Sequence, residues 1–388
     1  MFVTGSLVHG GAERHSITVM NRLSERGHEC HAVYVKNDPS QLGRIRLAGE
    51  GSVHCLDARR FLDWKAVEGF ADHLRRVAPS LLVAANGYAL MYSSLAAMRS
   101  GLRVPQVVTF HTTQVLGAKE HLKMLIDRPF FWRADRTVFV CENQQRYWLK
   151  RAVGSRSNEV IYNGVDTTHF NARAVAEDRP ALRARLGLAD SDYVIGLSAV
   201  MRPEKNHVQL VDAIAALRRK GIAARALMIG DGPLRPAVEA RVRQLGLNPS
   251  DVLISGFQQE VRPWVLASDV MVLCSLAVET FSLAALEAMA MGRPVVHADL
   301  GGASEMIIPG HNGFLFPVGD TAELVRHLAH LSQPDIAAQM GANARCLVES
   351  RFSEAAMVDR YEKSLSQLLA GPSPKLIAKL QGLPKSTS

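Results

Sequence analysis

The sequence lacks the features that mark several large classes of protein. Its 388 residues contain no apolar run near the roughly 18–20 residues that cross a bilayer. The chain does not open with a basic segment followed by an apolar stretch and a small-residue cleavage site, so we predict no signal peptide. The five cysteines are scattered and form no Cys-x-x-Cys pair. We therefore expect reduced thiols in a cytoplasmic protein, without disulfides or a zinc site.

Several catalytic and nucleotide-binding signatures are also missing. The chain contains no Gly-x-Gly-x-x-Gly, no Gly-x-x-x-x-Gly-Lys-Ser/Thr, no Gly-x-Ser-x-Gly and no His-Glu-x-x-His. Dinucleotide dehydrogenases, P-loop enzymes and serine hydrolases are thereby disfavoured, and we expect no metal site. A nicotinamide oxidoreductase would have to use Gly230-Asp-Gly232, which lacks the remaining glycine of that fingerprint.

The length and composition predict two cores and a basic surface. A chain of 388 residues with 47% apolar residues suits two domains of roughly 150–200 residues each. The formal net charge of +8 favours anionic partners such as phosphates. The basic residues are dispersed, with local clusters at 74–77 and 217–220. These residues either form solvated helix faces or attach the protein weakly to the cytoplasmic leaflet of a membrane. We expect no nucleic acid as a partner.

Short apolar runs alternate with longer amphipathic stretches, a pattern typical of βα units and a parallel sheet. A helix is expected over residues 12–26. A first series of strands is expected at 1–4, 31–35, 81–85, 106–110, 137–141 and 159–162, and a second at 193–198, 226–229, 252–254, 270–273, 294–296 and 313–316. Two such series predict an α/β fold with two doubly wound domains facing a cleft, where ligands bind outside the carboxyl ends of the strands.

The domain limits follow from where the strand pattern changes. Residues 166–192 contain few strand signals and many Ala, Arg and Asp residues, so the interdomain connection is placed there. We predict an N-terminal domain over 1–168 and a C-terminal domain over 169–351. An amphipathic helix follows within 352–371, and residues 372–388 are expected to be a frayed tail.

The segment from Glu279 to Glu287 is the most informative one. It follows the strand expected at 270–273, and Ser282 is suited to cap a helix over 283–291. A helix that starts at the carboxyl end of a parallel strand points free N–H groups and its positive dipole end at the cleft. It can therefore hold a phosphate.

The two carboxylates of this segment suit different parts of a ligand. Glu287 lies about 7 Å along the helix axis from the start of the helix. At this position it can accept hydrogen bonds from a ribose diol. Glu279, in the loop, can meet hydroxyls of a transferred sugar. Alternatively both are surface residues. The apolar neighbours Leu286 and Ala288 argue against this for Glu287, because they place it in a buried stretch.

Three smaller groups also lie where a cleft is expected. Arg202 and Lys205 follow the strand 193–198 and can neutralise a diphosphate, although alone they read as an ordinary charged turn. Gly10-Gly11 follows the first strand and lets the backbone approach a ligand. His111 directly follows the strand 106–110. It can bind sugar hydroxyls or a developing charge, or it is a structural histidine.

Together these segments resemble the retaining glycosyltransferase family 4, whose members have the GT-B fold of two Rossmann-like domains. The resemblance spans nearly the whole chain, from Phe2 to about Tyr361. The matching segments occur in the family's order: Gly5 to Arg14, Val160 to Phe170, Arg202 to Asn206, Ile229 to Leu234, Ser255 to Phe257, Ala267 to Val270, Glu279 to Val295, Gly301 to Glu305 and Gly313 to Leu315. The Glu-x7-Glu segment is the most specific of them.

The resemblance implies retaining transfer from a UDP- or GDP-sugar to a glycan or lipid-linked acceptor, without a metal or other cofactor. It implies that the C-terminal helix packs back on the N-terminal domain, and that the N-terminal domain binds the acceptor. The residues it implies for binding and catalysis are Arg202, Lys205 and the backbone amides near Ser282 and Leu283 at the diphosphate, Glu287 at the ribose, Gly256, Phe257 and Gln258 near the base, Glu279 and His111 at the donor sugar, Gly10 and Gly11 facing the donor from the N-terminal domain, and Phe281 as a further donor-binding residue.

One position departs from the family pattern. Many members carry the phosphate-binding arginine five residues before the lysine, where this chain has Val200. Arg202 lies only three residues before Lys205. The leading hypothesis is an enzyme of bacterial surface polysaccharide synthesis, such as lipopolysaccharide, O-antigen or capsule. The alternatives are a transferase on a soluble acceptor, similar to glycogen or sucrose synthases, and a sugar-binding scaffold subunit without activity.

Overall fold

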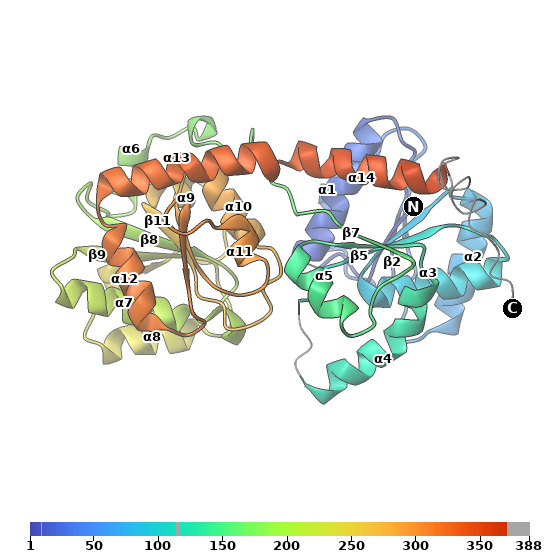
Figure 1. Ribbon diagram of the computed structural model, residues 1–388, viewed down its shortest axis with the longest axis horizontal. Helices are drawn as coiled ribbons and strands as arrows, with labels where there is room; N and C mark the ends of the chain where they lie inside the picture. Colours follow the sequence, from blue (N-terminus) through green and yellow to red (C-terminus); the bar gives the residue numbers. More distant parts are fainter. Residues whose placement is uncertain (9, 114–116, 371–388) are drawn as a thin grey trace, which may run out of the picture.

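The computed structural model describes residues 1–8, 10–113 and 117–370, apart from the side chains of residues 118–121. Two α/β halves lie side by side, and a long helical segment runs along one edge from one half to the other (Figure 1). Each half contains one parallel β-sheet. This arrangement confirms the predicted fold class of two doubly wound, Rossmann-like units.

The N-terminal half contains a seven-stranded sheet in the order β3-β2-β1-β4-β5-β6-β7. Its strands are β1 (Phe2–Thr4), β2 (Ala32–Tyr34), β3 (Val53–Cys55), β4 (Leu82–Ala85), β5 (Gln106–Phe110), β6 (Arg136–Phe139) and β7 (Ser157–Val160). The helices that accompany them are α1 (Gly11–Glu25), the short 3-10 helix η1 (Leu42–Arg44), α2 (Trp64–Val77), α3 (Asn86–Ser100), α4 (Ala118–Arg133) and α5 (Glu142–Leu149).

The C-terminal half contains a six-stranded sheet in the order β10-β9-β8-β11-β12-β13. Its strands are β8 (Tyr193–Ser198), β9 (Ala224–Ile229), β10 (Val252–Ile254), β11 (Val270–Leu273), β12 (Val295–Ala298) and β13 (Gly313–Phe316). The helices are η2 (Ala172–Ala174), α6 (Arg179–Arg185), η3 (Pro203–Lys205), α7 (His207–Arg219), α8 (Arg235–Gln244), η4 (Pro249–Asp251), α9 (Arg262–Ala267), α10 (Leu283–Ala290), α11 (Ala303–Met306), α12 (Thr321–His330) and α13 (Pro334–Arg351). The last helix, α14 (Glu354–Leu369), lies on the N-terminal half.

Apart from ends shifted by one or two residues in β1, β2, β4, β9 and β12, the strands differ from the sequence-based expectation at three places. β3 was not expected, because its three residues are partly exposed and give no apolar run. β6 ends at Phe139 rather than at Cys141, because the Cys141 sulfur accepts a hydrogen bond from the Gln144 amide and caps α5. β7 ends at Val160, and Tyr162 instead packs against aromatic rings outside the sheet.

The chain runs between the halves twice, and the two segments contact each other. The first segment leads from β7 to β8, and the second joins α13 to α14. Val165 lies on the first and pairs with the second, since its amide donates to the Phe352 carbonyl (3.0 Å) and its carbonyl accepts from the Glu354 amide (2.8 Å). α14 then packs on α1, with Tyr361 fully buried. The domain limits at 168 and 351 stay a prediction.

Both sheets reverse their strand order at one place, and these places face the interface between the halves. In the N-terminal sheet the reversal lies between β1 and β4, and in the C-terminal sheet between β8 and β11. At such a reversal, the loops that follow two neighbouring parallel strands run to opposite sides of the sheet. They leave a crevice at the carboxyl ends of the two strands. The segments after β1, β8 and β11 therefore meet at the interface.

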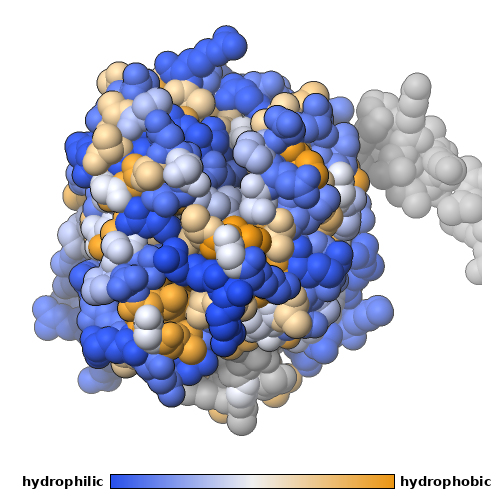
Figure 2. Space-filling model, turned by 90° about the vertical axis from the view of Figure 1, so that its left-hand side faces the viewer, coloured by the Kyte–Doolittle hydropathy of each residue, from blue (hydrophilic) through white to orange (hydrophobic). Residues whose placement is uncertain are grey.

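The surface of the C-terminal half is mainly polar at its outer end. Hydrophilic side chains cover most of this end, and hydrophobic ones form small separate patches (Figure 2). In the part of the chain that the structure describes, no helix is both long and apolar enough to span a membrane.

Candidate active site

A cleft of about 730 Å³ lies between the two halves. Both halves line it: Gly10, Gly11, Arg14 and His15 from the first, and Val200, Gly230, Asp231, Phe257, Gln258, Leu283 and Glu287 from the second, among others. The start of α1 faces the start of α10 across it, since a Cβ atom added to Gly11 would lie 4.0 Å from Cδ1 of Leu283. Six residues predicted from the sequence, Gly10, Gly11, Phe257, Gln258, Leu283 and Glu287, thus lie in one cavity.

The N-terminus of α10 presents unused backbone donors to this cleft. Ser282 caps the helix as its sequence predicts, because its hydroxyl accepts from the Ala285 amide at 3.3 Å. Within the described chain, no hydrogen-bond acceptor is found for the amides of Leu283 and Ala284. Free amides and the positive end of the helix dipole form a site for an anion such as a phosphate.

Glu287 lies one turn into α10 and is almost fully buried, with 5% of its surface exposed. Its carboxylate forms an ion pair with the Arg14 guanidinium from α1 of the other half. This interdomain partner accounts for the buried charge, which would otherwise be costly. The sequence did not indicate Arg14 as a site residue, although it ends the Gly-Gly segment and lies within the first turns of α1.

Glu279 and Lys205 form a second ion pair, in which Glu279 is buried and Lys205 is partly exposed. The Lys205 Nζ lies 2.6 Å from Oε2 of Glu279, and the Ser275 hydroxyl donates to the same oxygen at 2.9 Å. η3 places Lys205 just after β8, and the loop after β11 carries Glu279, so the pair forms at the reversal of the C-terminal sheet. Burial alone would raise the pKa of Glu279, but the charges of Lys205 and His297 and these hydrogen bonds lower it below its ordinary value.

Arg202, unlike Lys205, forms no ion pair with any residue of the described chain. Its side chain is exposed, and its guanidinium has no ion pair or hydrogen bond with any residue of the described chain. Val200 lines the cleft and is 48% exposed. The cleft therefore has Val200 where the family pattern would have an arginine, and the arginines that line it are Arg14, Arg22, Arg44 and Arg46.

His111 lies at the contact between the halves. Its carbonyl accepts from the Thr280 hydroxyl at 2.8 Å, and its amide donates to the Asn86 side chain at 2.8 Å. Its ring meets His15 edge-on at 4.7 Å between centroids, and Nε2 of His111 has no partner among the described residues. Burial and the neighbouring His15 hold the pKa of His111 well below its usual range. The ring is therefore neutral near pH 7 and acts as a hydrogen-bonding group.

Arg202, Lys205, Glu279, His111 and Ser282 are not among the residues that line the cleft, and neither are Phe281 and Gly256. The Phe281 ring is 4% exposed and packs against Tyr162 and Phe352, with centroids 5.0 and 5.3 Å away. Gly256 has a positive φ of 71° and forms an isolated bridge with Gly230, which lines the cleft. The Phe281 side chain thus belongs to the core, whereas Gly256 shapes the turn that leads to Phe257.

The loop that carries Glu279 is held by a close backbone contact with Gly301. A Cβ atom added to Gly301, whose φ is +63°, would lie 1.9 Å from the Glu279 carbonyl oxygen. We expect Gly301→Ala to lower the free energy of unfolding by about 2–4 kcal/mol, from the left-handed backbone and the overpacking together, and to lower activity. Gly310→Ala is the matched control, because its φ is +78° and nothing lies within 4 Å. If urea unfolding shows that both variants lose the same free energy of unfolding, the contact between Gly301 and the Glu279 carbonyl does not hold the loop.

Two family models match the chain, one in each half. The model described as Glycosyltransferase Family 4 matches residues 9–169, and the one described as Glycosyl transferases group 1 matches residues 192–333. Together they cover the segments that line both sides of the cleft.

Individual proteins resemble the chain in sequence or in fold. The N-acetyl-alpha-D-glucosaminyl L-malate synthase of Bacillus anthracis is 29% identical over 271 residues, which are 69% of each chain. EpsD of Bacillus subtilis (strain 168) is 30% identical over 207 residues, which are 53% of this chain and 53% of EpsD. The match thus spans about half the length of EpsD. The crystal structure of Anabaena HepE in complex with UDP shares the fold, with a TM-score of 0.80 at 23% identity, over 94% of this chain and 98% of HepE.

Proposed function

The chain belongs to the family 4 glycosyltransferases of GT-B fold, and on this premise we propose that it transfers a sugar from a UDP- or GDP-sugar to a glycan or lipid-linked acceptor, with retention of the anomeric configuration. The observation that carries the proposal is the arrangement around α10. Free amides at its N-terminus, the buried carboxylate of Glu287 and the Lys205–Glu279 pair all lie at the reversal of one parallel sheet.

The donor is proposed to lie along α10. Its diphosphate accepts from the amides of Leu283 and Ala284 and is neutralised by Lys205 and Arg202, so that no metal ion is required. Glu287 accepts from the ribose hydroxyls, and this exchanges its contact with Arg14 for one with the nucleotide. The base lies near residues 256–258. Crystals of HepE with UDP and with UDP-glucose support a uridine nucleotide as the first choice.

The donor sugar is proposed to lie between Glu279 and His111, with Gly10 and Gly11 close to it from the other half. In the proposed mechanism the acceptor hydroxyl attacks from the side of the leaving group, and the departing phosphate takes its proton. Lys205 and the α10 amides stabilise the charge that develops on this phosphate, while the neutral His111 ring bonds a sugar hydroxyl. Catalysis then consists mainly of positioning and charge stabilisation.

The exposed face of α4 supports a lipid-linked acceptor on the cytoplasmic leaflet. Its apolar side chains Leu122, Leu125, Ile126 and Trp132 are 61%, 53%, 46% and 55% exposed. The spacing of the first three places them on one side of the helix. α4 projects from the N-terminal half (Figure 1), the half proposed to bind the acceptor. The exposed Lys123 and Arg133 add positive charge beside the apolar residues.

Substitution of this face is expected to weaken membrane attachment. Leu122→Gln with Leu125→Gln should lower binding to vesicles that contain anionic lipid by about tenfold or more, because two exposed leucines no longer enter the interface. Co-sedimentation measures this. Ile308→Gln with Val318→Gln is the matched control, since these residues of the other half are 48% and 42% exposed. Equal losses in both pairs, or none, would favour a soluble acceptor.

The test of the proposed activity is release of nucleoside diphosphate from a panel of UDP- and GDP-sugars, with lipid-linked and soluble acceptors in separate reactions. Turnover with one donor is expected, together with a rise in thermal stability on binding it. If no nucleotide sugar is bound or consumed under any condition, the proposal fails. Binding without turnover would favour the scaffold alternative.

A further inference from the structure

A second cavity, of about 840 Å³, lies at the opposite end of the C-terminal sheet from the cleft. Tyr193 at the start of β8, Asp269 before β11 and Arg293 before β12 line it, so it lies at the amino ends of these strands. Arg173 and Arg179 line it from the segment between the halves, and Arg345 from α13. Its size lies within the range of roughly 300–1,000 Å³ that is usual for sites of small molecules.

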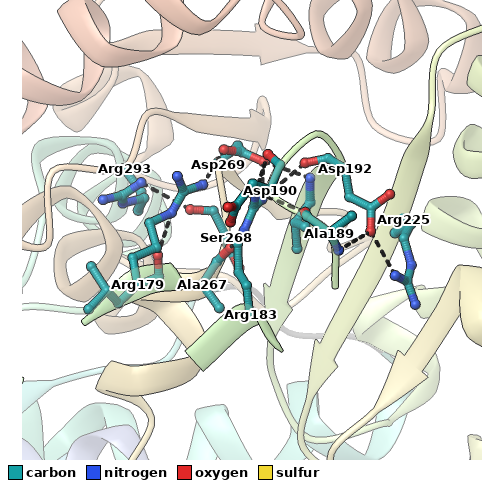
Figure 3. A network of polar contacts seen from close by, with 12 residues as sticks. Arg179, Arg183, Ala189, Asp190, Asp192, Arg225, Ala267, Ser268, Asp269 and Arg293 are labelled. Atoms are coloured by element: carbon teal, nitrogen blue, oxygen red, sulfur yellow. Dashed lines mark hydrogen bonds and ion pairs between the residues drawn. The ribbon is translucent and has the colours of Figure 1, made fainter. Parts of the chain in front are cut away.

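Three guanidinium groups gather around one carboxylate in its wall (Figure 3). Arg179 forms an ion pair with Asp269, and the fully buried Arg183 lies 2.7 Å from the other oxygen of this carboxylate. Arg293 lies beside them without any carboxylate partner among the described residues. Its Nη1 donates to the Ser268 carbonyl at 3.0 Å, and its buried Nε has no acceptor. The carboxylate of Asp269 is thus surrounded by three guanidinium groups.

The other carboxylates that line the cavity are paired with other arginines or are exposed. Asp192 pairs with Arg225 at 2.7 Å, and Glu349 pairs with Arg345 at 2.7 Å. The side chains of Arg173 and Asp190 are exposed and have no ion pair within the described chain. The groups that line the cavity balance in formal charge, with four arginines against four carboxylates: Arg173, Arg179, Arg293 and Arg345 against Asp190, Asp192, Asp269 and Glu349. Arg183 and Arg225, directly behind its wall, add two further guanidinium groups.

The pKa of Arg293 reflects its burial and the positive charges around it. Burial, and then the charge of Arg179, lower the pKa of Arg293 to about 10, and Asp269 offsets them only in part. A guanidinium group in such surroundings gains from an anion that arrives with oxygen acceptors, because it obtains a charge partner. The Tyr193 hydroxyl, which is buried without a partner, is a further donor in the same wall.

We propose that this cavity binds a small phosphorylated molecule, whose phosphate group is held by Arg293 together with Arg179 and Arg173. The phosphate meets Arg293 and Arg173, the two arginines of the lining that have no carboxylate partner among the described residues. The ligand joins the segment between the halves, through Arg173 and Arg179, to the sheet that carries the donor site. The proposal does not depend on the activity proposed for the cleft.

The test follows the thermal unfolding of the full chain over a concentration series of inorganic phosphate and of a hexose phosphate, at constant ionic strength. Both are expected to raise the unfolding temperature in a saturable way, because they bind the native state. In Arg293→Gln and in Arg173→Gln the half-saturating concentration should rise by about tenfold or more, as loss of a charge-assisted hydrogen bond implies. Arg173→Gln breaks no contact of the described chain and is the safer variant for folding.

Two control variants locate the binding. Arg326→Gln removes one exposed surface arginine away from the cavity and should keep the wild-type response. Lys205→Gln removes a cation of the proposed donor site and should keep the part of the response that Arg173→Gln weakens. An equal response in Arg173→Gln, Arg293→Gln and Arg326→Gln would overturn the proposal, as would a response that only Lys205→Gln abolishes. The unphosphorylated hexose should have no effect, and a stabilisation equal to that by the hexose phosphate would also overturn it.

Discussion

Replacement of Lys205 by glutamine is expected to lower sugar transfer by about 10²–10³-fold, the effect of removing one donor that stabilises charge in a transition state. Lys205 is the cation that the C-terminal half holds in a fixed position at the carboxyl end of its sheet, through its 2.6 Å contact with Glu279. Steady-state kinetics should show the loss mainly in kcat. Lys205→Arg should retain more activity than Lys205→Gln, and a loss of less than about tenfold in Lys205→Gln would contradict its role at the diphosphate.

The same substitution should reverse the pH dependence that Glu279 contributes to stability. In the wild type its pKa is lowered, so its contribution is present above the unfolded-state pKa and is lost as the pH falls through the folded-state value. In Lys205→Gln, burial dominates and the pKa rises, so stability should instead fall as the pH rises through the acid range. Near pH 7 the loss should be roughly 3 kcal/mol, the usual effect of leaving a buried charge unpaired.

Urea unfolding at about pH 5 and pH 8 measures this difference. Adding Glu279→Gln to Lys205→Gln removes the unpaired charge, and we expect the double variant to regain most of the stability at the higher pH while staying inactive. If the difference in free energy of unfolding between Lys205→Gln and the wild type is the same at both pH values, the charges of Lys205 and Glu279 do not hold the loop.

Replacement of Glu287 by glutamine is the second large expected effect. Donor affinity should fall by about 10–100-fold, because a charged acceptor for two ribose hydroxyls is lost. The affinity for UDP or GDP alone should fall equally, since Glu287 is proposed to bind the nucleotide and not the sugar. Calorimetric titration of nucleotide and nucleotide sugar compares the two.

Arg14→Gln separates this role from a structural one. It breaks the same ion pair between the halves but leaves the carboxylate of Glu287 free for a ribose. Affinity for the nucleotide should therefore stay within a few-fold of the wild type or improve. If Arg14→Gln weakens binding as much as Glu287→Gln does, then Glu287 acts by holding the halves together.

The fold could be predicted well from the sequence because its signals are local. Buried parallel strands are continuous apolar runs, and β5, β8, β10, β11 and β13 begin and end at the expected residues. The edge strand β3 could not be found in this way, since half-exposed residues such as His54 do not form an apolar run. The expected end of β6 was wrong because Cys141 looks like a strand residue but caps the next helix.

The candidate site could be predicted only where a single loop determines it. The start of α10 depends on Ser282 and its neighbours, which are adjacent in the sequence. The partner of Glu287 could not be predicted, because Arg14 lies 273 residues away and meets it only when the halves pack together. The burial of the Phe281 ring likewise depends on Tyr162 and Phe352 from distant segments. The cavity at the amino ends of the strands left no local signal.

The central claim is that the cleft between the two sheets holds a nucleoside-diphosphate sugar across both halves. Hydrogen–deuterium exchange with and without a saturating donor tests it most directly, since it reports protection segment by segment. We predict protection at the start of α10, residues 282–287, at residues 200–206 and at the start of α1, residues 10–15. Protection of none of these segments, or protection confined to the cavity around Arg293, would contradict the account.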